Sequence, residues 1–340
     1  YGDNGGAISP GAVGFDINCG VRVLALEATI DDIPNIKKLG GRIAGRIPAG
    51  ASGKGGLDIN MSEIKQLTQG GAQAAVELGI GYDEDLAVLE SNGLLEVEDN
   101  DLSSRALERG LRALGTLGSG NHFMELQSVE QIADQETAKQ WGLYEGQLLA
   151  MIHSGSRGLG HQVCSEHSRK LEQKYRKTAE GWHSEEYGFT LSDRQLACAP
   201  MFSKAGQDYL NQMNAAANFA FANRSALAHR LREVLKLEMG IDGEARTLYD
   251  VAHNIAKIET HNLHGKNCQC AVHRKGATRA FSGDSGHIEA SFQQTGQPVL
   301  VPGDMGTGSW IMAGPQTGQN HAFGSSCLGA GSALSSTKAQ

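Results

Sequence analysis

The chain has 340 residues, which is enough for one large domain or two ordinary ones, and its formal net charge of −8 excludes a generic basic coat for nucleic acid. Its six cysteines are scattered, which is typical of reduced thiols rather than of a disulfide scaffold. No apolar run approaches ~20 residues and no signal peptide is visible, so we expect a cytoplasmic protein without a membrane partner.

Apolar periodicity and capping residues predict a succession of helices and strands through the first 240 residues. Ser62 is the expected N-cap of one helix, and Gly79 lies just past the end of that helix. Short apolar or β-branched runs predict strands at 21–26, 123–126 and 147–152. Helices are predicted at 31–47, 62–78, 83–95, 102–114, 129–141, 161–178 and 204–238.

The last hundred residues are richer in strand and loop. We expect a helix or a strand-to-helix junction at 249–259, strands at 267–273 and 278–281, and mostly loop from 303 to 336. No internal repeat, linker or clean boundary is visible. The sequence therefore predicts one mixed α/β (α+β) domain over 1–340, with mixed sheets, packed helices and Gly-rich loops at strand ends.

Residues 14–20 place a carboxylate and a thiol three residues apart, between two glycines. An isolated buried carboxylate is costly and a thiolate needs a positive neighbour, so neither group suits an apolar core. If the segment turns, Asp16 and Cys19 can converge on a divalent metal ion, which would neutralise both. The alternative is a Gly-rich loop with a capping aspartate and a buried structural cysteine.

Three histidines could supply further ligands. His153 ends a predicted buried strand, His122 follows a glycine turn, and His253 lies in the junction near 249–259. Such positions project side chains into a cleft. With Asp16 and Cys19 they give five ligands, which is about right for two ions that share a bridging thiolate. Each histidine alone could instead be a satisfied polar group or a surface residue.

Glycine clusters indicate places where the backbone approaches a ligand closely. The glycine loops at 118–120, 303–308 and 329–331, together with Asn121 and Arg157, offer N–H groups and a guanidinium that suit phosphate.

Two further clusters bear on this interpretation, and the second of them is a rival metal site. Arg274, Lys275 and Arg279 form the densest basic cluster near the expected site, or else a solvated charged turn. The segment 261–273 resembles a loose zinc knuckle, but its two thiols share one face of a probable strand and its spacing fits no zinc module well. The ligands of this rival site would be His261, His264, Cys268, Cys270 and His273.

Six blocks in chain order resemble the RtcB family, the tRNA-splicing RNA ligases, and the resemblance covers essentially the whole chain. The blocks are GFDINCGVR at 14–22, GTLGSGNHF at 115–123, HSGSRG at 153–158, VAHNIAK at 251–257, HRKGATR at 273–279 and PGDMG at 302–306.

The resemblance implies a cleft that holds two manganese ions, with GTP as the cofactor. The implied metal ligands are Asp16, Cys19 as the bridging ligand, His122, His153 and His253. Arg157 would hold a terminal phosphate of the RNA. The nucleotide contacts of the family map onto Asn121, Phe123, Met124, Glu125, Asn254, Pro302, Gly303, Asp304, Met305, Ser309, Gly329, Ala330 and Gly331.

The reaction that the resemblance implies joins RNA ends carrying a 2′,3′-cyclic phosphate or 3′-phosphate to ends carrying a 5′-hydroxyl, as in tRNA splicing and RNA repair. A histidine is first guanylylated, GMP then passes to the RNA 3′-phosphate, and the 5′-hydroxyl displaces it. Two cations would lower the negative charge around the attacked phosphorus. The implied partners are RNA, such as tRNA exon halves, and an archease-like activator.

The chain departs from the family at the nucleophile. The family block Cys-His-Gly-Ala-Gly-Arg reads CLGAGS at 327–332, so Leu328 replaces the guanylylated histidine, and Ser332 and Ser336 replace two arginines. Leucine cannot form a phosphoramidate, and serine cannot supply a bidentate cation. Two alternatives therefore stand beside the ligase. One is a metal-dependent pseudo-ligase or cyclic-phosphate phosphodiesterase, and the other is an inert truncated product, since we expect the family's terminal segments to be absent.

Overall fold

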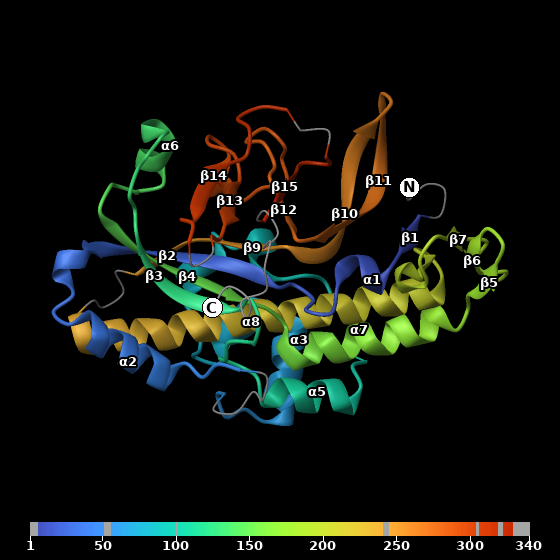
Figure 1. The fold of residues 1–340 in the computed structure, drawn as a ribbon, viewed down its shortest axis with the longest axis horizontal. Coiled ribbons are helices and arrows are strands. Elements are labelled where there is room, and N and C mark those ends of the chain that lie inside the picture. The colour runs from blue at the N-terminus through green and yellow to red at the C-terminus, as the bar shows by residue number, and fades with distance from the viewer. Residues whose placement is uncertain are drawn as a thin grey trace.

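The computed structural model describes residues 6–50, 56–99, 101–240, 245–303, 306–318 and 322–328. At its centre lies a four-stranded antiparallel sheet in the order β3-β4-β2-β9. In Figure 1 this sheet runs above the long helix α8 (Lys204–Met239), and smaller sheets lie on its other side. The bounds of the four strands are Phe123–Ser128 for β3, Gln147–Ser154 for β4, Gly20–Thr29 for β2 and Arg246–Ala252 for β9.

The inner strands of this sheet are buried on both faces. All eight residues of β4 are buried, which explains why its sequence reads as a continuous apolar run. Along β2 the side chains alternate between two cores. Leu24 belongs to the core that contains Leu227 of α8, whereas Val23 belongs to the core that contains Phe281 and Leu300.

Helix α8 supports the sheet from below. It begins at the N-cap Ser203, whose hydroxyl accepts a hydrogen bond from the N–H of Gly206, and it ends at Gly240 with a φ of 72°. Its middle, residues 215–228, is wholly buried and rich in alanine, so neighbouring helices approach closely. The helices α3 (Met61–Glu77) and α7 (Arg157–Glu172) pack against it.

The remaining elements surround this sheet and helix. They are β1 (Ala7–Ile8), α1 (Pro10–Val13), η2 (Ile30–Asp32), α2 (Ile36–Arg46), α4 (Asp83–Leu86), η3 (Glu90–Gly93), α5 (Ser104–Leu111), α6 (Gln135–Gln140), β5 (Arg176–Thr178), β6 (Gly181–His183), β7 (Thr190–Leu191), η4 (Arg194–Leu196), β8 (Ala199–Pro200), β10 (Asn254–Leu263), β11 (Lys266–Lys275), β12 (Ala277–Arg279), η5 (Ala290–Phe292), β13 (Pro298–Val301), β14 (Trp310–Ala313) and β15 (Ser325–Cys327).

The expected single domain of mixed helix and sheet is confirmed, and each ladder between the strands named above is antiparallel. The helix predicted at 204–238 is confirmed as α8. The helix predicted at 62–78 is α3, but its N-cap is Asn60 and not Ser62, because the Asn60 side chain accepts hydrogen bonds from the N–H groups of Ser62 and Glu63.

Other helix bounds were predicted too long or too late. The helix expected at 129–141 shrinks to α6, because Asp134 caps its first turn. The helix expected at 161–178 begins at Arg157 and ends at Glu172, and the strand β5 follows it.

The helix or junction expected at 249–259 is wrong, since this stretch forms the end of β9 and the start of β10. The reason is that β10 buries charged and polar side chains and exposes an apolar one. Its buried positions carry Lys257, Glu259 and His261, while Ile258 is exposed, so the strand alternation is hidden from a hydrophobicity pattern.

Strands β10 and β11 form a long hairpin that projects from the body of the molecule (Figure 1). His264 and Gly265 close it with φ angles of 52° and 82°, as a two-residue turn of this hand requires. Among the described residues, no helix is both long and apolar enough to cross a membrane.

Candidate metal centre

The register of the central sheet brings the expected ligands to one edge. In the pairing of β2 with β9, Gly20 faces Ala252, and in the pairing of β2 with β4, Val21 faces His153. Phe123, the first residue of β3, also faces His153. The expected ligands at or next to these strand ends are Cys19, His122, His153 and His253.

The loop before β2 is held in a turn by backbone hydrogen bonds. The Cys19 N–H donates to the Asp16 carbonyl at 3.0 Å, and Asn18 lies in the left-handed region with a φ of 51°. The Asn18 N–H donates to the Asn254 carbonyl at 2.6 Å, and the His253 N–H donates to the Cys19 carbonyl at 2.8 Å. The loop is therefore fixed to the junction of β9 and β10.

Five donor atoms converge above this loop in two groups that share Cys19. The Cys19 Sγ lies 3.2 Å from His122 Nε2 and 3.3 Å from His153 Nε2. The Nε2 atoms of His153 and His253 are 2.9 Å apart, and His122 Nε2 is 2.7 Å from Asp16 Oδ2. Within each group the donor atoms lie within 4.8 Å of one another. All five residues singled out from the sequence thus meet in space.

Burial favours the neutral forms of the cysteine and of two histidines in this cluster. Burial raises the pKa of the Cys19 thiol well above its usual value, and the Asp16 carboxylate adds to that effect. Burial lowers the pKa of His253 to about 4. Burial, together with the charge of the neighbouring His253, lowers the pKa of His153 well below its usual value. Burial opposes ionisation of Asp16, but the hydrogen bond and charge of His122 outweigh it and lower the Asp16 pKa. A divalent cation is the group that would favour the thiolate here.

The donor set fits transition-metal ions. Ligand atoms about 2.0–2.3 Å from one ion lie roughly 3–4 Å from each other, close to the separations between these donors. The carboxylate suits manganese, whereas the thiolate and imidazoles also suit zinc. The Gly118 N–H donates to His122 Nδ1 at 3.0 Å, which places the proton of a neutral ring on Nε2. Nε2 of His122 would therefore have to lose this proton before it could bind a metal ion.

Residues 155–157 hold the Asp16 carboxylate from the side. The Arg157 N–H donates to Asp16 Oδ1 at 3.1 Å. A side chain at Gly155 would place its Cβ 2.7 Å from both carboxylate oxygens, so this approach requires glycine. The Arg157 guanidinium donates to the Gly50 carbonyl at 2.7 Å and to the Thr116 hydroxyl at 3.3 Å. Its contact with an RNA phosphate stays a prediction.

Several residues expected to contact a nucleotide come together beside β3. The Gln127 side chain donates to Glu125 at 3.0 Å and to the Ser309 hydroxyl at 2.9 Å, and the Gly303 N–H donates to that hydroxyl at 3.0 Å. The Phe123 ring meets the His153 ring edge-on, with centroids 5.4 Å apart. The loop after β13 is therefore joined to β3, the strand that starts at the sheet edge where the expected ligands lie (the metal edge).

The other expected nucleotide contacts are more dispersed. The Asn254 side chain donates to the Asp16 carbonyl at 3.3 Å, so Asn254 supports the metal loop. Met124 is half-buried and packs against the core on the α8 side of the sheet. Asn121 is exposed and Pro302 is half-buried. Asp304, Met305, His321, Gly329, Ala330, Gly331, Ser332 and Ser336 lie outside the described residues.

Leu328 occupies the position of the expected nucleophile, close to the metal edge. Its N–H donates to the Gly276 carbonyl at 3.1 Å, and the Gly276 N–H donates to the His253 carbonyl at 2.8 Å. Its side chain is 8% exposed and belongs to the core that contains Val21 and Tyr249. An apolar side chain thus occupies the position at which we expected a nucleophile.

Two residues of the basic cluster, Arg274 and Arg279, neither face an open phosphate site nor lie in a solvated turn. Arg274 is buried and donates to both carboxylate oxygens of Glu259, at 2.6 and 2.9 Å. Arg279 is buried with its Nε 3.0 Å from Glu90. Buried cations need such partners, which the spacing in the sequence did not reveal. Lys275 alone is exposed.

The rival zinc site at 261–273 does not assemble, because no three donors of this segment meet within the part of the chain that the structure describes. His261 forms a hydrogen bond with Glu259 at 2.9 Å instead. Both ring nitrogens of His273 have other partners, since Nε2 accepts from the Ser9 N–H at 3.1 Å and Nδ1 lies 3.0 Å from the Ala271 carbonyl.

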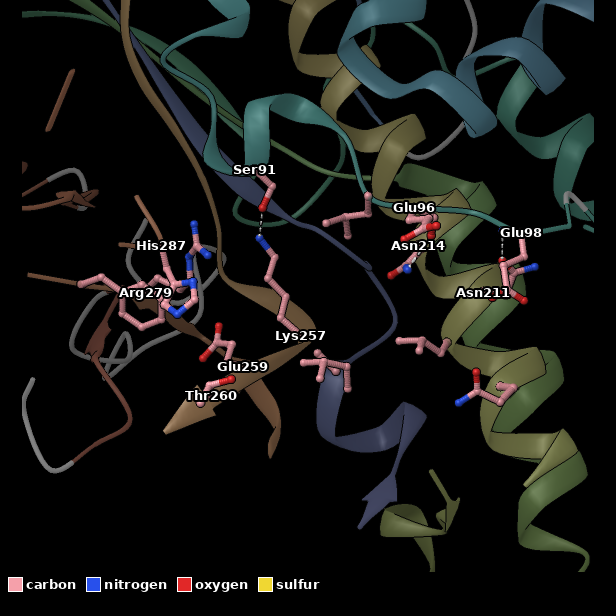
Figure 2. Close-up of a pocket in the computed structure, with 16 residues that line it drawn as sticks. Ser91, Glu96, Glu98, Asn211, Asn214, Lys257, Glu259, Thr260, Arg279 and His287 are labelled. Carbon is pink, nitrogen blue, oxygen red and sulfur yellow. Dashed lines mark hydrogen bonds between the residues drawn. The ribbon is translucent and has the colours of Figure 1, made fainter. Parts of the chain in front are cut away.

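A separate groove of about 450 Å³ lies between β10 and α8, and none of the five donors lines it (Figure 2). At one side of the groove, Lys257 donates to Glu90 at 2.7 Å and to Ser91 at 2.8 Å. Arg279 pairs with the same carboxylate. Glu90 thus offsets the cations of the groove, and the metal edge remains the candidate reaction centre.

Residues beneath the metal loop escaped the sequence analysis. Arg224 of α8 is fully buried and donates to the carbonyls of Asn18 and Ser154, at 2.8 and 3.0 Å. It also pairs with Asp250 of β9 at 2.7 Å. The available signal was a charged residue inside the alanine-rich run at 215–228, because a buried arginine requires partners.

The chain is similar to proteins of one family along nearly its whole length. The model of the RtcB family, described as tRNA-splicing ligase RtcB, matches residues 2–340. The tRNA-splicing ligase RtcB of Archaeoglobus fulgidus is 44% identical over 342 residues, which cover 99% of this chain and 69% of that protein. The protein of the same name from Methanococcus maripaludis is 45% identical, over 98% of this chain and 69% of the relative. The one from Thermococcus kodakarensis is 44% identical, over 97% and 68%.

Proposed function

Because the chain belongs to the RtcB family of tRNA-splicing ligases, we propose that it joins RNA ends at a centre built on Asp16, Cys19, His122, His153 and His253. The observation that carries this proposal is the convergence of four donor atoms on a fifth, the shared Cys19 sulfur, at a single edge of the sheet. The proposed substrates are an RNA end with a 2′,3′-cyclic phosphate or 3′-phosphate and an RNA end with a 5′-hydroxyl.

Two manganese ions and GTP are the proposed cofactors. When bound, the ions would neutralise charge on the attacked phosphate and on the leaving oxygen. Asp16 and Cys19 would hold them from the loop and the three histidines from the strand ends, while the Arg157 guanidinium lies beside this centre for a terminal phosphate. Glu125, Gly303 and Ser309 are grouped by hydrogen bonds and are the proposed nucleotide side of the cleft. An archease-like activator and a cytoplasmic location are proposed on family membership alone.

A second candidate rests on one observation, the leucine at position 328. A leucine offers no lone pair for a covalent bond to GMP, so a protein–GMP intermediate requires another residue. A phosphodiesterase needs no such intermediate, because water adds to the phosphorus of a 2′,3′-cyclic phosphate and one ring P–O bond breaks to leave a monoester and a hydroxyl. The same metal centre would serve this hydrolysis.

One experiment separates the two candidates. The full chain is incubated with manganese and GTP labelled on its α-phosphate and then denatured, and in parallel with RNA ends that carry a cyclic phosphate and a 5′-hydroxyl. A covalent label with a joined RNA product supports the ligase and locates its nucleophile, for which His321 is the nearest histidine in sequence. Opening of the cyclic phosphate without a label supports the phosphodiesterase. If a chain that binds manganese gives neither a covalent label nor an opened cyclic phosphate, both candidates are overturned.

A further inference from the structure

A fully buried arginine lies directly beneath the metal loop. Nη1 of Arg224 donates to the carbonyls of Asn18 and Ser154, at 2.8 and 3.0 Å, and Nη2 donates to Asn18 Oδ1 at 3.1 Å. Asn18 stands between the two donors of the loop, and Ser154 directly follows His153. One guanidinium therefore ties the loop that carries two donors to the strand end that carries a third.

The same guanidinium reaches the strand that leads to His253. Its Nε donates to Asp250 Oδ2 at 2.8 Å and its Nη2 to Asp250 Oδ1 at 2.7 Å. Arg22 of β2 donates to the same carboxylate at 2.7 Å. Arg22, Arg224 and Asp250 are all fully buried, so each charge depends on the others. The network thus joins α8 to the three strand ends around the site.

Asn18 shows how closely this network controls the loop. Its φ of 51° is uncommon for a residue with a side chain, and both ends of its amide are engaged. Nδ2 donates to the Ala217 carbonyl of α8 at 2.7 Å, and Oδ1 accepts from Arg224. Gly20 lets the guanidinium approach, since a Cβ there would lie 3.0 Å from its central carbon.

We propose that Arg224, acting through Asn18, is a positioning residue for the metal centre. It holds the loop backbone in the turn that points Asp16 and Cys19 at the histidines. Its guanidinium donates to Asn18, Ser154 and Asp250, which are not among the five proposed ligands, so it acts on the metal centre through these residues. The consequence for metal rests on the proposed function, whereas the positioning of the loop rests on the hydrogen bonds alone.

Arg232 offers a matched control on the same helix. It is 7% exposed and donates to both carboxylate oxygens of Asp85, at 2.7 and 2.8 Å. Its other hydrogen bonds go to Ala245 and Thr247, away from the metal loop. Arg224→Lys and Arg232→Lys therefore each disturb one buried bidentate pair and keep the charge. Only Arg224→Lys also breaks contacts to the loop.

Hydrogen–deuterium exchange of the metal-free full chain tests the positioning directly. Arg224→Lys is expected to raise exchange about tenfold in residues 16–20 and 252–255, while Arg232→Lys leaves these segments as in the wild type. Asn18→Gly keeps a backbone that tolerates positive φ but removes the side-chain bonds, so it gives a smaller increase and carries the test if Arg224→Lys does not fold. Unchanged protection of the loop in a folded Arg224→Lys or Asn18→Gly protein would overturn the proposal.

Cobalt(II) titration, followed by the thiolate-to-cobalt absorption band, tests the consequence for metal. We expect Arg224→Lys to bind cobalt about 10- to 100-fold more weakly than the wild type, with an altered band, and Arg232→Lys to match the wild type. A wild-type protein without the band would refute the proposed metal centre, and the exchange experiment would still decide the role of Arg224. A normal band and affinity in Arg224→Lys would refute the positioning role alone.

Discussion

The backbone N–H of His253 donates a hydrogen bond to the backbone carbonyl of Cys19 at 2.8 Å. Two expected metal ligands from distant parts of the sequence are thus held together by the continuation of the β2–β9 pairing. The sheet and the loop hydrogen bonds organise this site within the protein itself. Removal of a ligand side chain should therefore weaken metal binding but leave the protein folded.

Replacement of the shared ligand tests this expectation. Cys19→Ala should reduce bound manganese from two ions per chain to near zero, because each group of donors loses the same sulfur. Metal content of the desalted protein, measured by mass spectrometry, gives the number. Cys164→Ala is the control, since Cys164 is equally buried but lies in α7 with Pro10 and Ser168 as partners. Unchanged metal content in Cys19→Ala would refute the shared thiolate.

The close approach of Gly155 to Asp16 gives a second prediction. In Gly155→Ala the new Cβ would lie 2.7 Å from both carboxylate oxygens, so the carboxylate must move and manganese affinity should fall about 10-fold or more. Calorimetric titration with manganese measures the change. Gly40→Ala in α2 meets no atom within 4 Å, so it should keep the affinity and add roughly 0.5–1 kcal/mol of stability. Equal affinities in the two variants would contradict the steric argument.

Restoring an imidazole at the nucleophile position gives a third prediction. Leu328→His should gain a covalent label from GTP labelled on its α-phosphate, because position 328 adjoins Gly276, whose N–H donates to the His253 carbonyl. The variant should lose about 1–3 kcal/mol of stability, since a polar ring enters an apolar core. The label is measured after denaturation of the protein in acid.

Ile288→His is the matched control for that gain. Ile288 belongs to the same core and has the same exposed fraction of 8%, so the two variants should lose similar stability. Only Leu328→His should accept GMP. A folded Leu328→His protein that stays unlabelled would show that the chain lacks more than its nucleophile.

The buried carboxylate of Glu90 makes stability depend on pH. Burial opposes its ionisation, but the charges of Lys257 and Arg279 outweigh that effect and lower its pKa from 4.5 to about 2. Because the folded-state pKa is the lower one, the contribution is complete above pH 4.5 and is lost as the pH falls toward 2. A difference of this size corresponds to about 3 kcal/mol.

Urea denaturation between pH 6 and pH 3 checks this dependence. The free energy of unfolding of the wild type should decrease as the pH falls, and Glu90→Gln should flatten the decrease. Glu90→Gln should also lose about 3–5 kcal/mol near neutral pH, because Lys257 and Arg279 stay buried without their carboxylate. Glu98→Gln, at an exposed position, should follow the wild type. A Glu90→Gln profile as steep as that of the wild type would contradict the assignment.

The cluster of five donor residues could be predicted from the sequence because most of its signals are local. A thiol and a carboxylate between glycines, and a histidine at the end of a buried strand, each carry a chemical cost that a metal would remove. Strand β4 could also be predicted from the sequence, since burial on both faces leaves a continuous apolar run.

The features that escaped prediction depend on tertiary partners. In β10 the buried face carries Lys257 and Glu259, whose partners lie elsewhere in the chain, so its pattern does not read as a strand. Arg274 reads as a surface charge in the sequence, but in the structure it is buried against Glu259. Arg224 supports the site through Asn18, and no spacing rule connects residues so far apart.

Anomalous diffraction from a crystal of the wild-type chain soaked in manganese tests the central claim most directly. We predict two anomalous peaks, both within bonding distance of the Cys19 sulfur, one beside Asp16 and His122 and the other beside His153 and His253. A single peak that does not touch Cys19, or a peak at the hairpin of β10 and β11 instead, would contradict the two-ion centre.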